Sequence, residues 1–230
     1  MRYCIGDIHG CYKTFKELIL QLFLESKHPD IYIVGDIIDR GPNSKAVIDL
    51  IFDLRQQGFT IECVCGNHED MLKEAYQKNL KLNDTKWQLN GAKSTISSFN
   101  PQADLNLKVK ELIPNHYYKY LSSLPYFIEL DDYIIVHAGL NFKANNPFSD
   151  LESMLWTREE NYDYNVSKGR KIIHGHTPVP FDQIRSNLTS NQVNVINIDS
   201  GCVYTQHPGL GSLTAINLDT NKLFNIPNID

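Results

Sequence analysis

Residues 3–36 read YCIGDIHGCYKTFKELILQLFLESKHPDIYIVGD, and this stretch decides the fold. Two short runs rich in Ile, Tyr and Val, at residues 3–5 and 31–34, have the length and composition of buried strands. Between them, apolar residues recur at helical spacing and form one face, namely Phe15, Leu18, Ile19, Leu22 and Phe23. The stretch therefore predicts a strand, a helix and a second strand, the unit from which parallel sheets are built.

The same layout continues along the chain. A helix-start signal at 42–44 precedes a second apolar helical face, and residues 61–65, IECVC, predict a third strand. Further strands are expected at 127–130, 133–136, 171–173 and 193–198, and residues 213–223 have the pattern of a closing hairpin. Parallel units early and hairpins late predict an α/β fold with a mixed sheet.

The middle of the chain has a different pattern. Residues 70–124 predict helices broken by loops, with Trp87, Leu89 and Ile96 as apolar anchors, and we interpret them as a helical cap on a single domain of residues 1–230. Residues 186–192, SNLTSNQ, are expected to connect two strands.

Composition limits the cellular setting and the partners. The formal net charge is -5 without runs of like charge, which gives no sign of a nucleic-acid or membrane partner. The apolar runs are far shorter than the about 20 residues that cross a bilayer. Five cysteines, an odd and sparse set, suit buried thiols in a reducing compartment, so we expect a cytoplasmic protein. The oligomeric state is left open.

Polar residues follow almost every predicted strand. They are Asp7 and His9; Asp36, Asp39 and Arg40; Asn67 and His68; His137; and His174 and His176. Each of them alone would pass for a core histidine or a turn residue, but such clusters after successive strands indicate one site, because ligand sites lie at the carboxyl ends of parallel strands. Carboxylates, imidazoles and an amide together suit manganese, iron or zinc. Asp7 and His9, two positions apart on an extended chain, point the same way and can hold one ion.

The motifs GDIHG, GDIIDRGP and GNHED, followed by HAGL and HGHTP, resemble those of the calcineurin-like metallophosphoesterases. The resemblance is to the phosphoprotein phosphatase branch, which includes phage and bacterial serine/threonine phosphatases. It runs from Tyr3 to about Leu218 and includes LWTRE and NIDSGCVY. It implies a sandwich of two mixed β-sheets flanked by helices.

The resemblance also implies a centre of two divalent ions, manganese foremost, with iron or zinc as alternatives. Asp36 would bridge the two ions. The remaining ligands would be Asp7 and His9 on the first ion, and Asn67, His137 and His176 on the second. Many relatives carry Gly-His-X-His where this chain has GHTP, so His174 is left over. It would either orient a ligand or contact metal or substrate directly.

In the implied reaction, water activated between the ions attacks phosphorus directly. His68 would protonate the leaving oxygen, with Asp39 as its orienting partner, although Asp39 also suits a turn or an ion pair with Arg40. Arg40, Arg158 and Asn67 would bind the phosphate, since a guanidinium offers two parallel donors. Arg158 could instead pair with a neighbouring acid.

The resemblance implies a serine/threonine protein phosphatase that acts on a phosphorylated protein or a small phosphate ester. The alternative is a symmetrical dinucleoside tetraphosphate hydrolase, and a non-catalytic binding scaffold is a third interpretation. The sequence has no glycine-rich nucleotide fingerprint and no aromatic cluster clearly placed to stack on bases, which favours the phosphatase.

Overall fold

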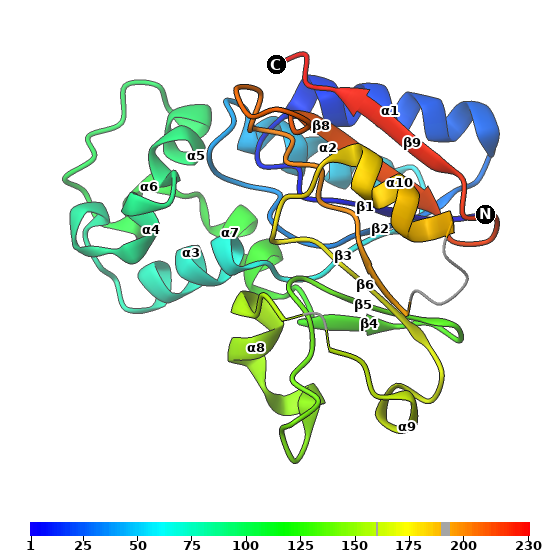
Figure 1. The fold of residues 1–230 in the computed structure, drawn as a ribbon. Helices are drawn as coiled ribbons and strands as arrows, with labels where there is room; N and C mark the ends of the chain where they lie inside the picture. The colour runs from blue at the N-terminus through cyan, green and yellow to red at the C-terminus, as the bar shows by residue number, and fades with distance from the viewer. Residues whose placement is uncertain (160, 190–193) are drawn as a thin grey trace.

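The computed structural model describes residues 1–159, 161–189 and 194–230. Nine described strands form two sheets (Figure 1). The first sheet has the order β3-β2-β1-β8-β9 and comprises β1 (Arg2–Ile5), β2 (Asp30–Ile33), β3 (Ile61–Cys63), β8 (Ser212–Asn217) and β9 (Leu223–Pro227). The second has the order β4-β5-β6-β7 and comprises β4 (Phe127–Glu129), β5 (Tyr133–Val136), β6 (Lys171–His174) and β7 (Val195–Asn197).

Both sheets are mixed. Strands β1, β2 and β3 pair in parallel, joined by α1 (Tyr12–Glu25) and α2 (Ser44–Gln56), and β8 and β9 add an antiparallel edge. In the second sheet β5, β6 and β7 are parallel, and β4 joins β5 as an antiparallel hairpin partner. The predicted strand, helix and strand units, the strands expected at 127–130 and 133–136 and the hairpin expected over 213–223 are confirmed.

Side chains alternate between two apolar layers. Tyr3 and Ile5 of β1 pack with α1 and α2, whereas Cys4 and Tyr32 pack against Ile135 of the second sheet. Another apolar cluster covers the outer face of the second sheet, where Met154 of α8 (Leu151–Trp156) packs on the strands. The structure is therefore the expected sandwich of two mixed sheets flanked by helices.

Half of the described helices lie between β3 and β4 in the sequence and to one side of the two sheets in space (Figure 1). They are α3 (Asn67–Gln77), η1 (Leu82–Asp84), α4 (Lys86–Leu89), α5 (Ala92–Phe99), α6 (Val109–Leu112) and α7 (Asn115–Ser122). Trp87 and Ile96 are fully buried there, but Leu89 is 83% exposed, so its predicted role as an anchor is wrong. That this region acts as a cap on a single domain stays a prediction.

The later helices are short. They are η2 (Pro147–Ser149), α8, α9 (Tyr164–Ser167) and α10 (Phe181–Thr189). Helix α10 takes up the first part of the connection expected at 186–192, and residues 190–192 lie outside the described part of the chain.

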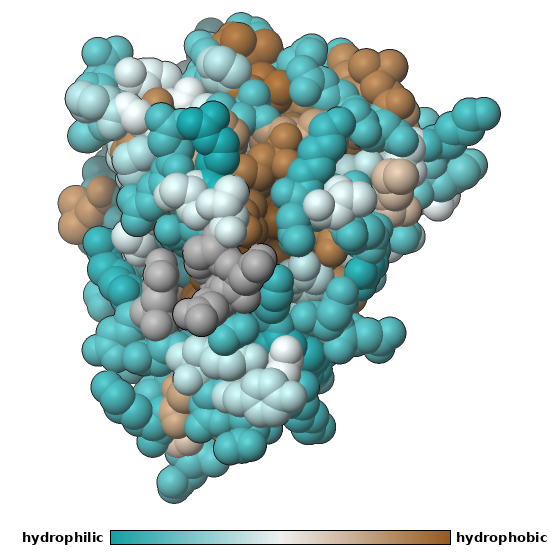
Figure 2. Space-filling model, turned by 45° about the vertical axis from the view of Figure 1, so that its right-hand side comes forward, coloured by the Kyte–Doolittle hydropathy of each residue, from teal (hydrophilic) through white to brown (hydrophobic). Residues whose placement is uncertain are grey.

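The surface is mostly polar on the face shown in Figure 2, where hydrophobic residues appear as a strip in the upper half. Among the described helices, none is long and apolar enough to cross a membrane. All five cysteines are buried free thiols, as expected. The cytoplasmic location and the absence of nucleic-acid and membrane partners stay predictions.

One buried carboxylate fixes the loop after β2. Glu69, in the first turn of α3, accepts hydrogen bonds from the backbone N–H groups of Asp36 (2.9 Å), Ile37 (3.0 Å) and Ile38 (3.3 Å). It also accepts one from Gly66 (2.9 Å), where any Cβ would collide with the Asp36 carboxylate. Glu69 therefore holds the residues that follow β2 against the start of α3.

Replacing Glu69 should destabilise the whole fold. Glu69→Ala leaves four buried N–H groups without their acceptor and should lower the free energy of unfolding by at least about 3 kcal/mol. Glu69→Gln keeps one acceptor oxygen and should cost less. Urea unfolding measures both changes, with exposed Glu62→Ala on β3 as the control. A Glu69→Ala protein within about 0.5 kcal/mol of the wild type would contradict this role.

Candidate metal centre and active site

The strand ends bring the predicted site residues together, but on an unusual backbone. The φ angle is positive at five of them, with values of 46° at His9, 48° at Asp36, 69° at Asp39, 68° at Arg40 and 69° at His176. Non-glycine residues rarely adopt this left-handed conformation, and strained backbone of this kind concentrates at functional sites.

Asp36 lies at the centre of the site. Its Oδ2 is 3.5 Å from Nε2 of His9, 3.5 Å from Nε2 of His137 and 3.9 Å from Nε2 of His68. Two groups of side chains with metal-ligating atoms within 4.8 Å of one another share this carboxylate, His9–Asp36–His68 and Asp36–His137–His176. The shared position matches the bridging role expected of Asp36.

Asn67 joins the second of these groups. Its Oδ1 is 2.9 Å from Nε2 of His137 and 3.2 Å from Nδ1 of His176. The same two ring nitrogens are 3.2 Å apart. The structure thus brings together all four residues expected on the second ion, although their role as ligands stays a prediction.

Backbone carbonyls orient two of the imidazoles. Nδ1 of His9 lies 3.0 Å from the carbonyl oxygen of Ile38, and Nδ1 of His137 lies 2.9 Å from that of Val34. Because a carbonyl only accepts, both rings carry their proton on Nδ1 and point an unprotonated Nε2 toward Asp36. Burial lowers the pKa of both histidines, which favours the neutral form that binds metal.

The site has more buried negative charge than its own side chains balance. Burial, together with the charges of Asp199 and Asp36, raises the pKa of Asp7 well above its usual value. Burial and the Asp36 charge raise the pKa of Asp199 to about 7. Nε2 of His68 and of His176 are buried without a hydrogen-bond partner among the described residues. Divalent cations would balance the buried carboxylates, so this set of donors fits them.

The residues expected to bind the first ion are less closely clustered than those expected to bind the second. Asp7 is buried and accepts a hydrogen bond from the backbone N–H of His176 at 3.1 Å, but it belongs to neither group of clustered ligands. Nη1 of Arg40 lies 2.6 Å from Nε2 of His9, the nitrogen expected to bind the ion. An ion at His9 therefore requires Arg40 to give up this contact.

The expected pair of His68 and Asp39 is present. Nδ1 of His68 donates to Oδ2 of Asp39 at 2.7 Å, and both side chains are fully buried. Burial alone would lower the pKa of His68, but Asp36 and Asp39 outweigh it and raise this pKa above its usual value. A histidine that keeps its proton suits a general acid, and that role for His68 stays a prediction.

His174 lies apart from both ligand groups. It is buried at the end of β6, its Nδ1 is 3.1 Å from the carbonyl oxygen of Gly175, and burial lowers its pKa to about 4. Both interpretations of His174, orienting a ligand or contacting metal or substrate, therefore stay open.

A cleft with a cavity volume of about 360 Å³ opens onto the centre. Its lining residues are Asp36, Arg40, Asn67, Asn90, Trp156, Arg158, His176, Thr177, Pro178, Tyr204, His207 and Leu210. All three side chains expected to bind phosphate are among them. The alternative that Arg158 pairs with an acid stays open, because Glu159 pairs with Lys143 and Glu160 lies outside the described residues.

The cleft also has aromatic walls, which the sequence did not reveal. Trp156, at the end of α8, is 44% exposed, and its ring lies edge-on to His176 at 6.0 Å. Tyr204 packs edge-on to His207 at 5.5 Å and lies 5.7 Å from the guanidinium of Arg40. The structure therefore gathers aromatic rings around the cleft, and whether bases stack on them stays a prediction.

Comparisons with known proteins agree with this geometry. The family model for calcineurin-like phosphoesterases matches residues 3–210. The asymmetrical bis(5'-nucleosyl)-tetraphosphatase PrpE of Anoxybacillus flavithermus is 29% identical over 97% of this chain and 92% of its own length. A symmetrical bis(5'-nucleosyl)-tetraphosphatase of Wigglesworthia glossinidia brevipalpis is 43% identical, over 36% of this chain and 29% of its own. The structure of a protein serine/threonine phosphatase of Saccharomyces cerevisiae aligns with a TM-score of 0.64 at 18% identity, covering 100% of this chain and 80% of that chain.

Metal binding should depend more on Asp36 than on His174. Asp36→Asn removes the carboxylate charge that the two clustered groups share and should reduce the bound Mn²⁺ below the about two ions per chain of a dinuclear site. His174 belongs to neither clustered group, so His174→Ala should keep the metal and cost at most about 100-fold in phosphoesterase activity. Elemental analysis of the purified variants measures the difference.

The exposed His116→Ala provides a control for losing a histidine. If His174→Ala lost more metal than Asp36→Asn, the roles given to the two histidines in HGHT would be wrong.

Proposed function

The chain belongs to the calcineurin-like phosphoesterase family, and we propose that within it the protein is a metal-dependent hydrolase of dinucleoside tetraphosphates. This family uses a dinuclear divalent-metal centre, and the two groups of clustered ligands in this chain fit one. The serine/threonine phosphatase interpretation, preferred on the sequence alone, becomes the second candidate.

One observation carries the proposal, namely the aromatic rings in the same cleft as the phosphate-binding arginines. Trp156, Tyr204 and His207 line the walls of the cleft around Arg40 and Arg158. A nucleoside stacks on such rings, whereas a phosphoserine side chain has nothing to place against them. Two arginines and two divalent ions would also offset the negative charge of a tetraphosphate chain.

The size of the cleft supports a small substrate. Its volume of about 360 Å³ falls in the range of about 300–1,000 Å³ that is usual for small-molecule sites. PrpE of Anoxybacillus flavithermus, which aligns over 97% of this chain, is named as a bis(5'-nucleosyl)-tetraphosphatase. The likeness to the yeast phosphatase, at 18% identity, concerns the fold alone.

Each residue of the site would have a separate role in the reaction. When bound, the two ions would supply water with a pKa lowered from about 15.7 toward neutrality. Asp36 would bind both ions, Asp7 and His9 would complete the first set of ligands, and Asn67, His137 and His176 the second. Arg40 and Arg158, with Asn67, would hold the phosphate oxygens. His68, oriented by Asp39, would give its Nε2 proton to the leaving oxygen.

Manganese is the ion we propose. Three imidazoles together with carboxylates and an amide favour a transition ion over magnesium, which prefers oxygen ligands and keeps its waters. Iron and zinc share this ligand preference and are the alternatives to compare.

The substrate is tested with Mn²⁺-loaded protein, assayed in parallel on diadenosine tetraphosphate and a panel of phosphoserine and phosphothreonine peptides. We expect kcat/KM for the dinucleotide to be higher by at least about tenfold, equivalent to about 1.4 kcal/mol. The products also identify the bond that is cleaved, since asymmetrical hydrolysis gives AMP and ATP and symmetrical hydrolysis gives two ADP. Faster turnover of the peptides would overturn the proposal in favour of the protein phosphatase.

Variants of the aromatic walls provide the structural part of this test. Trp156→Ala and Tyr204→Ala should raise KM for the dinucleotide by about 5-fold to 150-fold, the equivalent of about 1–3 kcal/mol for stacking one base. Glycerol phosphate, which has no ring, should keep its KM. Tyr164→Ala, on exposed α9 outside the cleft, is the matched control.

A further inference from the structure

The carboxylate of Asp39 has partners that the reaction described above does not use. Oδ2, which accepts the His68 hydrogen bond, also accepts one from Nε1 of Trp87 at 2.6 Å. Oδ1 accepts a hydrogen bond from the hydroxyl of Thr95 at 2.5 Å. Both oxygens of this fully buried group are therefore held by residues of α4 and α5.

The backbone of Asp39 is held in the same way. Its N–H lies 2.9 Å from the Thr95 hydroxyl oxygen and 3.0 Å from that of Ser44, and these two hydroxyls are 2.9 Å apart. Asp39 has a φ of 69°, a conformation that neighbouring contacts must stabilise in a residue with a side chain. Thr95 thus binds the main chain and the side chain of the residue that orients His68.

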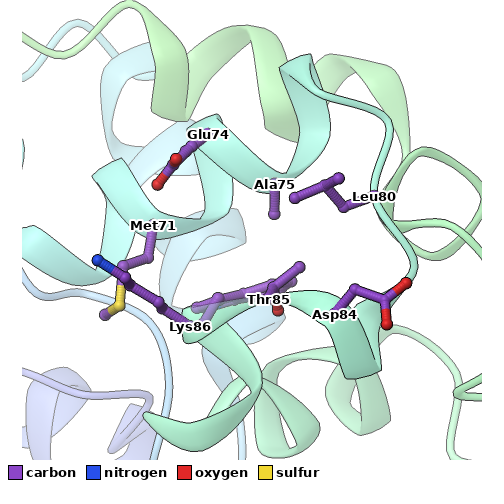
Figure 3. Close-up of a pocket in the computed structure, with 8 residues that line it drawn as sticks. Met71, Glu74, Ala75, Leu80, Asp84, Thr85 and Lys86 are labelled. Carbon is purple, nitrogen blue, oxygen red and sulfur yellow. The ribbon is translucent and has the colours of Figure 1, made fainter.

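Trp87 is held both by packing in the main core cluster and by this hydrogen bond. Besides Asp39, its surroundings include a cavity of about 180 Å³ between α3 and the segment that leads into α4 (Figure 3). The other lining residues are Met71, Glu74, Ala75, Leu80, Asp84, Thr85 and Lys86. The indole is fully buried, and its N–H is directed at Asp39, so the ring and the carboxylate hold each other in place.

We propose that Trp87 and Thr95 are positioning residues for proton transfer by His68. They fix the rotation of the Asp39 carboxylate, so that Oδ2 stays in line with Nδ1 of His68 and Nε2 faces the leaving oxygen. The helical region therefore contributes to the catalytic geometry through two hydrogen bonds that span 48 and 56 positions of sequence. This requires phosphoester hydrolysis with His68 as the acid, and it does not depend on a nucleotide substrate.

The test uses Trp87→Phe, which keeps the ring and removes the N–H, and Thr95→Val, which keeps the shape and removes the hydroxyl. Mn²⁺-loaded variants are assayed on glycerol phosphate, whose alkoxide leaving group needs a proton, and on 4-nitrophenyl phosphate, which needs little. We expect kcat for glycerol phosphate to fall about tenfold or more, a part of the about 10²–10⁴ that general acid catalysis supplies. For 4-nitrophenyl phosphate the loss should be clearly smaller, with KM and metal content unchanged.

Three further variants calibrate the result. His68→Asn removes the acid itself, and it sets the largest expected difference between the kcat losses on the two substrates. Thr95→Ser keeps the hydroxyl and should retain activity. Tyr120→Phe removes another buried aromatic polar atom from the same core cluster, one without a hydrogen-bond partner among the described residues, and should leave both substrates unaffected.

The ratio of the two kcat values does not depend on how much enzyme is folded, so a destabilised variant cannot mimic the effect. Equal kcat losses on both substrates in Trp87→Phe and Thr95→Val would overturn the proposal. So would no loss in these two variants when His68→Asn loses more activity on glycerol phosphate than on 4-nitrophenyl phosphate. Equal kcat losses on both substrates in His68→Asn would overturn it as well, because His68 would then not be the acid. If the peptides were the better substrates, the proposed function would fail while this inference could still hold.

Discussion

The site depends on one buried charge, the carboxylate of Asp36. It lies within 3.9 Å of imidazole nitrogens of His9, His68 and His137 and also accepts the backbone N–H of His68 at 3.1 Å. Burial alone would raise its pKa, but the charge of His68 and the hydrogen bond from its backbone N–H favour the ionised carboxylate and help to lower this pKa well below its usual value. A carboxylate kept ionised at the junction of two sets of ligands can serve two cations at once, and Glu69 holds the loop that positions it.

The two sheets meet at this charge. The end of β2 supplies Asp36, the start of α3 supplies Asn67, and the end of β5 supplies His137 from the other sheet. Nδ1 of His137 hydrogen-bonds the carbonyl of Val34, which follows β2, so one imidazole both links the sheets and offers its second nitrogen to the site. The sandwich thus brings together motifs that are far apart in the sequence, and the cleft with Arg40 and Trp156 opens above them.

The recurrence of short apolar runs followed by polar clusters predicted strands of both sheets and the residues that gather at their ends, because burial and periodicity act locally. The second sheet packed on the first came only from resemblance, since nothing local encodes packing between sheets. Periodicity misplaced Leu89, which is exposed next to buried Trp87. The aromatic cleft and the bonds from Trp87 and Thr95 to Asp39 were not predictable, because they join segments far apart in the sequence. The bonds to Asp39 also involve a left-handed backbone at that residue.

The central claim is that Asp36 is shared by two metal ions. Anomalous diffraction from crystals of the Mn²⁺-loaded protein, collected near the manganese absorption edge, tests it most directly. The account predicts two peaks about 3.5–4 Å apart, both within bonding distance of the Asp36 carboxylate. A single peak, or two peaks that do not share Asp36, would contradict it.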